Sequence, residues 1–157
     1  MHLTTNKMHQ PTDNTYRTAL QDRLAALALE SVGVLEYLPA EQCASSGIIG
    51  TPDCALVGHG LKLLVYIDGT PPEEEIAIGM IGRLIHARER NRETDTEIVL
   101  CTGGNVPFHY ERTLERFGIL VCASNSPGAA AEMVARLLDK NETTGSEQEA
   151  NLFNHNL

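Results

Sequence analysis

Three carboxylates in this 157-residue chain could do metal chemistry: Asp53, Asp68 and Glu36. Asp53 and Asp68 stand at the outer ends of two apolar runs that are joined by a Gly-His-Gly turn, within residues 54–67. Carboxylate oxygens suit Mg²⁺, and a bound Mg²⁺ can position a water and neutralise charge on a phosphate under attack. We therefore name Asp53 and Asp68 as candidate catalytic residues, and all three carboxylates as candidate metal ligands.

The residues around these carboxylates leave two interpretations open. In a metal site, His59 or Lys62 would be close enough in sequence to act as a base. In the alternative, the two aspartates only end strands, because Asp is common in turns and Asp68-Gly69 is itself a turn dipeptide. His59 between two glycines would then be an exposed turn residue.

Arginines gather in the second half of a predicted helix at residues 73–92. Arg83, Arg88, Arg90 and Arg92 could contact the phosphates of a nucleic acid. Acidic residues are interleaved among them, so a solvated helix face is the alternative.

A Gly103-Gly104-Asn105 segment follows a predicted buried strand and precedes a predicted helix. Doubly wound proteins place anionic ligands in the crevice at such a strand end, so these three residues are candidate ligand-binding residues. A plain connecting loop is the alternative.

The four cysteines, Cys43, Cys54, Cys101 and Cys122, stand singly in apolar surroundings and form no Cys-X-X-Cys pair. We expect buried, reduced thiols that pack as small apolar side chains. A redox pair of Cys101 and Cys122 is the alternative, since their predicted strands could be neighbours.

Hydrophobic periodicity defines the elements that would position these groups. An amphipathic helix is predicted from Asp13 to Glu30. Both faces of the second hairpin strand are apolar up to Asp68, which indicates a strand covered by helices on both sides. The remaining predicted elements are a strand at 32–38, a loop at 40–51, strands at 97–102 and 119–123, and helices at 73–92, 107–117 and 126–140.

These elements predict an α/β fold of three layers, with a central mixed sheet of about five strands and helices on both faces. We expect a single domain at residues 12–140, with disordered tails at 1–11 and 141–157. A formal net charge of −9 argues against broad, non-specific nucleic-acid binding, although a local basic patch is compatible with it. No apolar run is long enough for a membrane span or a secretory signal, so we expect a soluble, cytoplasmic protein without a membrane partner.

The order helix, strand, hairpin, helix, strand, helix, strand, helix resembles the restriction-endonuclease-like, or PD-(D/E)xK, superfamily over most of residues 13–140. Pro52-Asp53 opens the hairpin, and Val65 to Gly69 (VYIDG) is similar to the second hairpin strand of very-short-patch repair relatives. The resemblance implies one acidic residue on the first hairpin strand and an acid-X-Lys triplet on the second. Tyr66 stands where the second acid would be, and Asp68 stands where the lysine would be. The resemblance therefore implies a nuclease-like domain that is catalytically degenerate and has a nucleic-acid-related role. Such a domain requires no cofactor, and we expect bound Mg²⁺ only if the chain cleaves nucleic acid.

A second resemblance is to response-regulator receiver domains. Asp68, Thr102 and the segment 118–127 are similar to the phospho-acceptor strand, the switch-threonine strand and the last strand of a receiver. Cys122 occupies the place of the receiver's lysine, and nothing before Tyr16 can form the first strand with its acidic pair. This resemblance implies a non-enzymatic regulatory or protein-interaction module that binds a protein partner or forms a homodimer.

Overall fold

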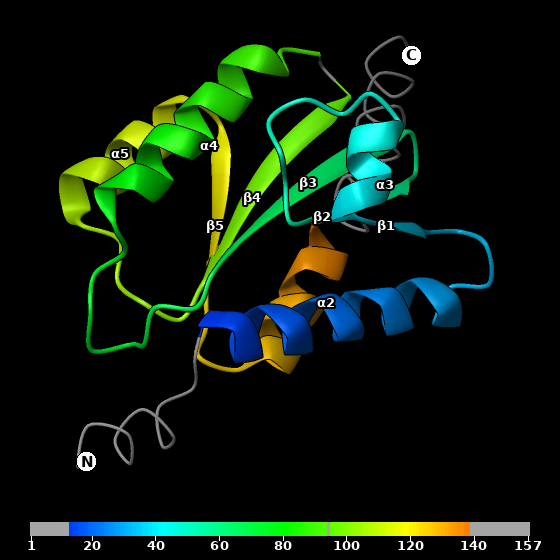
Figure 1. Cartoon of the computed structure of the whole chain (residues 1–157), viewed down its shortest axis with the longest axis horizontal. Helices are drawn as coiled ribbons and strands as arrows, with labels where there is room; N and C mark the ends of the chain where they lie inside the picture. Colours follow the sequence, from blue (N-terminus) through cyan, green and yellow to red (C-terminus); the bar gives the residue numbers. More distant parts are fainter. Residues whose placement is uncertain (1–12, 94, 139–157) are drawn as a thin grey trace, which may run out of the picture.

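The computed structural model describes residues 13–93 and 95–138, so the two predicted tails lie outside the described residues. Figure 1 shows the path of the chain. The elements in order are α2 (Asp13–Glu30), β1 (Glu36–Pro39), α3 (Ala40–Ser45), β2 (Cys54–Gly58), β3 (Leu61–Asp68), α4 (Ile78–Arg90), β4 (Thr96–Thr102), α5 (Phe108–Arg116), β5 (Ile119–Ala123) and a helix at 127–138.

The five strands form one mixed sheet in the order β1-β2-β3-β4-β5. The first three strands pair antiparallel, while β3, β4 and β5 pair parallel. Helices α4 and α5 are the crossover connections between the parallel strands, and both pack on the same face, as connections of one hand require. The predicted α/β class, mixed five-strand sheet and helices on both faces are confirmed.

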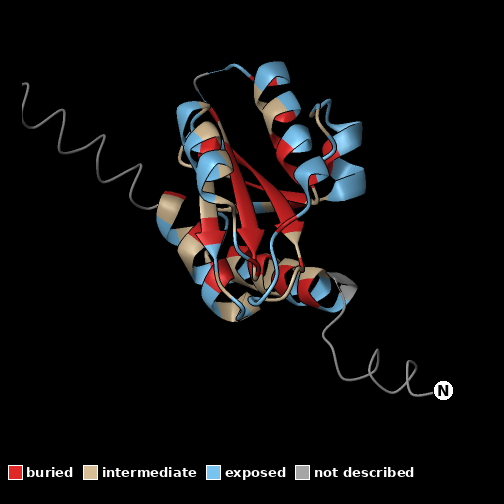
Figure 2. Cartoon of the chain, turned by 90° about the vertical axis from the view of Figure 1, so that its left-hand side faces the viewer, coloured by how far each residue is buried: buried red, intermediate tan, exposed pale blue. Residues whose placement is uncertain are grey.

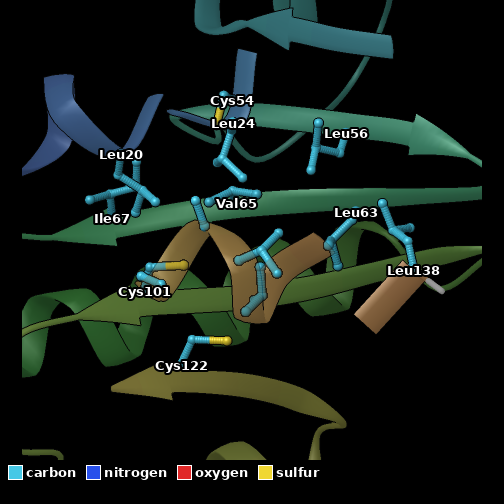
Figure 3. Packing of buried hydrophobic residues seen from close by; sticks show 14 of the residues in the cluster. Leu20, Leu24, Cys54, Leu56, Leu63, Val65, Ile67, Cys101, Cys122 and Leu138 are labelled. Atoms are coloured by element: carbon cyan, nitrogen blue, oxygen red, sulfur yellow. The ribbon is translucent and has the colours of Figure 1, made fainter. Parts of the chain in front are cut away.

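Each face of the sheet has its own apolar core (Figure 2). On one face, α2 and the helix at 127–138 cover the sheet through residues such as Leu20, Leu24 and Leu138. Figure 3 shows Leu20 beside Ile67, Leu24 near Val65, and Leu138 beside Leu63 at the other end of β3. On the other face lie α3, α4 and α5. Strand β3 is therefore buried on both sides, as its apolar sequence predicts.

The hairpin between β2 and β3 closes as predicted. Gly58 pairs with Leu61, which leaves His59 and Gly60 as a two-residue loop. Their φ angles are 55° and 75°, the positive values that a type I′ hairpin turn needs at both central positions.

Three predicted boundaries are wrong for identifiable reasons. The first strand begins at Glu36 rather than at residue 32, because Val32 and Gly33 have positive φ angles and form a turn. The predicted loop at 40–51 contains α3, whose Cys43 is buried against the sheet. Helix α4 begins at Ile78, five residues late, since Glu75 pairs with Asn105 in an isolated parallel bridge.

All four cysteines are buried and free, which confirms the predicted thiols. Cys101 and Cys122 are directly opposite each other on β4 and β5, so their strands are neighbours. The hydrogen bond between these two thiols is the largest cause that raises the pKa of Cys101 and lowers the pKa of Cys122. Within the described residues, none of the helices has the length and apolar character to cross a membrane.

Candidate functional site

Asp53 forms an ion pair with Arg17 of α2 at the edge of the sheet where the parallel strands end. Arg17 Nε lies 3.1 Å from Asp53 Oδ1, and the two side chains are 25% and 16% exposed. The second carboxylate oxygen, Oδ2, accepts a hydrogen bond of 2.7 Å from the backbone N–H of Ile67. Arg17 Nη2 donates to the carbonyl of the same Ile67 at 3.2 Å. The pair therefore holds both backbone groups of one residue of β3.

Ile67 needs these partners because the β2 strand ends before it can pair with Ile67. The register pairs Cys54 with Val65, so continuing the ladder would bring Pro52 opposite Ile67. Proline has no N–H to donate, and an unpaired backbone group beside a buried strand costs about 1–3 kcal/mol. The Arg17–Asp53 pair supplies the missing donor and the missing acceptor. Gln21 of α2 holds the same corner by donating to the Asp53 carbonyl at 3.0 Å.

Asp53 is thus poorly placed to serve as a metal ligand. Each of its carboxylate oxygens already faces a donor inside the protein, and a cation would have to compete with the Arg17 guanidinium. Within the described residues, no group of three or more His, Cys, Asp or Glu side chains is arranged to hold a metal ion.

Asp68, at the end of β3, closes a local turn. Its Oδ1 accepts hydrogen bonds from the backbone N–H and the hydroxyl of Thr70, at 2.9 and 2.5 Å. This side-chain to backbone contact two residues on is the Asx-turn expected from an Asp-Gly dipeptide. Asp68 also lines an open pocket.

The pocket lies between α2 and α4, over the end of β3, and has a volume of about 460 Å³. Its charged lining residues are Arg17, Asp68 and Arg83. Ala77, the N-cap residue of α4, and Met80 in its first turn supply apolar wall. Asp53 is not among the lining residues and reaches the pocket only through Arg17. The two aspartates therefore lie at the same edge of the sheet without facing the pocket together.

Tyr66 is the residue that the nuclease resemblance aligns with a second acid. It is fully buried, and its hydroxyl donates to the carbonyl of Gly50 at 2.6 Å. The Arg83 guanidinium lies 5.5 Å from the centre of its ring, in cation–π range. Burial raises the pKa of Tyr66 to about 12, although the charge of Arg83 acts in the opposite direction. Tyr66 is therefore a neutral structural side chain in the physiological pH range.

The other candidates for metal chemistry lie at the opposite end of the hairpin. Glu36 pairs with Val57, four residues along β2 from Asp53, which is about 13 Å at the rise of a strand. Lys62 also pairs with Val57, and His59 is in the turn beyond it. This register therefore places Glu36, His59 and Lys62 away from Asp53 and gives no support to a metal site that they would share with it.

The predicted arginine cluster separates into side chains with different roles. Arg83 donates to the Thr51 carbonyl at 3.2 Å and lines the pocket. Arg88 donates to the carbonyls of Thr96, at 3.1 Å, and Asn91. Arg92 forms an exposed ion pair with Glu89. Arg88 is thus a structural clamp between the end of α4 and the start of β4, and Arg90, Arg92 and Arg83 are exposed.

The Gly103-Gly104-Asn105 segment mainly packs against the connection between β3 and α4. A Cβ atom on Gly104 would lie 2.6 Å from Thr70 Cγ2 and 2.9 Å from the Glu74 carbonyl oxygen. Asn105 exchanges backbone hydrogen bonds with Glu74 and Ile76, and its amide donates to the Pro72 carbonyl at 2.9 Å. The glycines therefore allow two loops to approach closely.

Gly103 also lines a second, more apolar crevice of about 350 Å³. Tyr16, Pro71, Asn125 and Pro127 are among its other lining residues, and the Tyr16 hydroxyl donates to the Ser124 carbonyl at 2.6 Å. The crevice lies where the chain leaves β4 for one face of the sheet and β5 for the other. Of the three predicted ligand-binding residues, Gly103 alone lines this crevice.

Comparison with known proteins adds no relative, because no family model, curated protein or solved structure matches the chain. The site residues that the sequence does not reveal are Arg17 and Thr70. Arg17 lies 36 positions before Asp53 on an amphipathic helix, where an arginine is the ordinary solvated residue. Thr70 could have been found from its place two residues after Asp68, the spacing of an Asx-turn.

Proposed function

We propose that this chain is a restriction-endonuclease-like domain that does not cleave and that acts as a binding module. Three features support the assignment: a leading helix, an antiparallel hairpin that Pro52-Asp53 opens, and helix–strand units that extend the sheet in parallel. The proposal keeps the architecture of the nuclease resemblance and gives up its metal chemistry.

One observation is the main support for a domain that does not cleave. The Asp53 carboxylate is bound by Arg17 and by the N–H of Ile67, so it completes the sheet rather than a metal site. The next strand carries Tyr66 where a second carboxylate is needed, and its hydroxyl is hydrogen-bonded to Gly50. A hard cation prefers several oxygen ligands, and among the described residues that line the pocket Asp68 is the one carboxylate, beside the guanidinium groups of Arg17 and Arg83.

The receiver-like alternative is less well supported by the sheet. Receivers belong to the doubly wound folds of parallel strands in the order 2-1-3-4-5, whereas β2 here runs antiparallel between β1 and β3. Thr102, the counterpart of the switch threonine, is fully buried, and its hydroxyl accepts the N–H of Gly104 at 2.9 Å. Its hydroxyl is thus already engaged within the loop that follows β4.

A nucleic-acid partner would use the exposed end of α4. Arg90 and Arg92 are exposed there, while the chain as a whole is acidic. Binding through these two residues would weaken steeply with salt, because each phosphate contact releases counterions. We expect an Arg90→Glu/Arg92→Glu variant to lose any affinity for DNA. Affinity that neither the variant nor added salt changes would exclude this surface.

A metal titration of thermal stability tests the loss of cleavage. Wild-type protein and Asp53→Asn are heated with increasing Mg²⁺ or Mn²⁺, beside an assay for cleavage of DNA. A ligand that binds only the folded state at 100 times its Kd stabilises it by about 2.7 kcal/mol, which is easily seen. We expect the two proteins to respond alike and neither to cleave. Saturable stabilisation of wild type that Asp53→Asn lacks would contradict the proposal.

A further inference from the structure

The pocket between α2 and α4 contains two opposite charges that bind other groups. Asp68 and Arg83 both line it. Asp68 accepts its hydrogen bonds from Thr70 through Oδ1, and Arg83 Nη2 donates to the Thr51 carbonyl. Within the described residues, no ion pair joins Asp68 to Arg83. A side-chain anion and a side-chain cation are therefore both presented to whatever enters.

Arg17, the third charged lining residue, does not add a net charge to those of Asp68 and Arg83. Arg17 is neutralised by Asp53, 3.1 Å away, and its guanidinium also serves the Ile67 carbonyl. The charge that the pocket offers to a ligand is thus one carboxylate and one guanidinium. A ligand of a single sign would be attracted by one of them and repelled by the other.

The rest of the lining includes surface for a short apolar group. Pro71, Ala77 and Met80 supply apolar wall, and about 460 Å³ lies within the range of small-ligand sites. The first turn of α4 starts at this wall without an acidic residue and without a side-chain cap, so its partial positive charge adds to that of Arg83. The pocket therefore has a more positive end at α4 and a negative point at Asp68.

We propose that this pocket binds a small zwitterion of the α-amino-acid class. The ammonium group of the ligand binds the Asp68 carboxylate, its carboxylate binds the Arg83 guanidinium, and an apolar side chain packs on Met80 and Pro71. The inference goes beyond the proposed function and does not depend on it, because neither a metal nor a nucleic acid takes part.

Calorimetric titrations of the full chain test the assignment with matched probes. Leucine, methionine and phenylalanine carry both charges, their amides lack the carboxylate, and their deaminated acids lack the ammonium. We expect at least one amino acid to bind the wild type, and its amide and deaminated acid to bind about tenfold more weakly or worse. Arg83→Gln should weaken the amino acid by a similar factor and leave the amide unchanged. Asp68→Asn should weaken the amino acid and leave the deaminated acid unchanged.

Arg90→Gln is the control, since this exposed arginine of the same helix does not line the pocket, and its affinities should equal those of wild type. If Asp68→Asn does not fold, the affinities of Arg83→Gln for the amino acid and for its amide are a sufficient test. Arg83 is exposed, so we expect this variant to fold. The assignment is overturned if none of the three amino acids binds the wild type. It is also overturned if Arg83→Gln weakens the amide as much as the amino acid.

Discussion

Arg17 and Asp53, 36 positions apart in the sequence, meet at 3.1 Å and together satisfy the backbone N–H and carbonyl of Ile67. This pair takes the place of the ladder that β2 would have continued if Pro52 could donate a hydrogen bond. The acidic residue that most suggests catalysis therefore binds the backbone at the end of the sheet. The predictions below follow from this relationship and from the contacts around it.

Removal of the Asp53 carboxylate should destabilise the fold in the absence of any metal. Asp53→Ala leaves the N–H of Ile67 without its acceptor and Arg17 without this ion-pair partner, and we expect a loss of about 2–3 kcal/mol. Urea denaturation in a metal-chelating buffer measures it. Asp22→Ala, on the exposed part of α2, is the control and should change the free energy of unfolding by about 0.5 kcal/mol or less. Equal stability of the two variants would contradict the role given to Asp53.

Gly104→Ala should destabilise the protein, because the new methyl group would collide with Thr70 and with the Glu74 carbonyl. Overpacking of this kind costs about 1–3 kcal/mol. Gly79→Ala, in α4, is the matched control: its Cβ would meet nothing within 4 Å, and helix propensity favours it by about 0.5–1 kcal/mol. The two melting temperatures should move in opposite directions. A stabilised Gly104→Ala would mean that the two loops do not pack as described.

Tyr66→Phe should reduce the loss of stability in alkaline solution. Burial raises the pKa of Tyr66 from 10.0 to about 12, so folding favours the neutral phenol. Its contribution is complete below pH 10 and is lost as the pH rises from 10 to 12. Burial is also the largest cause that raises the pKa values of Tyr16 and Tyr37. The variant should therefore retain part of the decrease in the free energy of unfolding with rising pH. Unfolding free energies across this range measure the difference, and identical slopes would contradict it.

Arg88→Ala and Arg90→Ala should differ in stability although they are two residues apart. Arg88 serves the carbonyls of Thr96 and Asn91, so its removal should cost about 1–2 kcal/mol. Arg90 is exposed, and its removal should change stability by about 0.5 kcal/mol or less. Chemical denaturation of the two variants under one condition compares them. If Arg88→Ala does not change the free energy of unfolding, the structural role given to Arg88 is wrong.

The sequence predicts the hairpin well because its information is local. Gly58, His59 and Gly60 set the turn, and the alternating apolar residues of β3 set its register against β2. Helix α2 is likewise predicted with its observed ends, and its periodic apolar residues are the ones that pack on the sheet. In both cases the deciding contacts lie within a few residues.

The missed features depend on contacts between distant residues. Three glutamates at 73–75 favour a helix start by charge, but the pairing of Glu75 with Asn105 across the sheet edge delays it to Ile78. Helix α3 is too short for a periodic signal and is held by the burial of Cys43. The pocket combines residues from α2, the end of β3 and α4, so no single stretch of sequence could reveal it.

Site-resolved Mn²⁺ binding tests most directly the claim that Asp53 belongs to the sheet and not to a metal site. Bound Mn²⁺ broadens the NMR signals of nearby amides, so a titration of the wild-type protein reads out any metal held at this edge. The account predicts no selective broadening at Ile67, Asp68 or Tyr66 at low metal concentration. Saturable broadening of these amides that disappears in Asp53→Asn would contradict it.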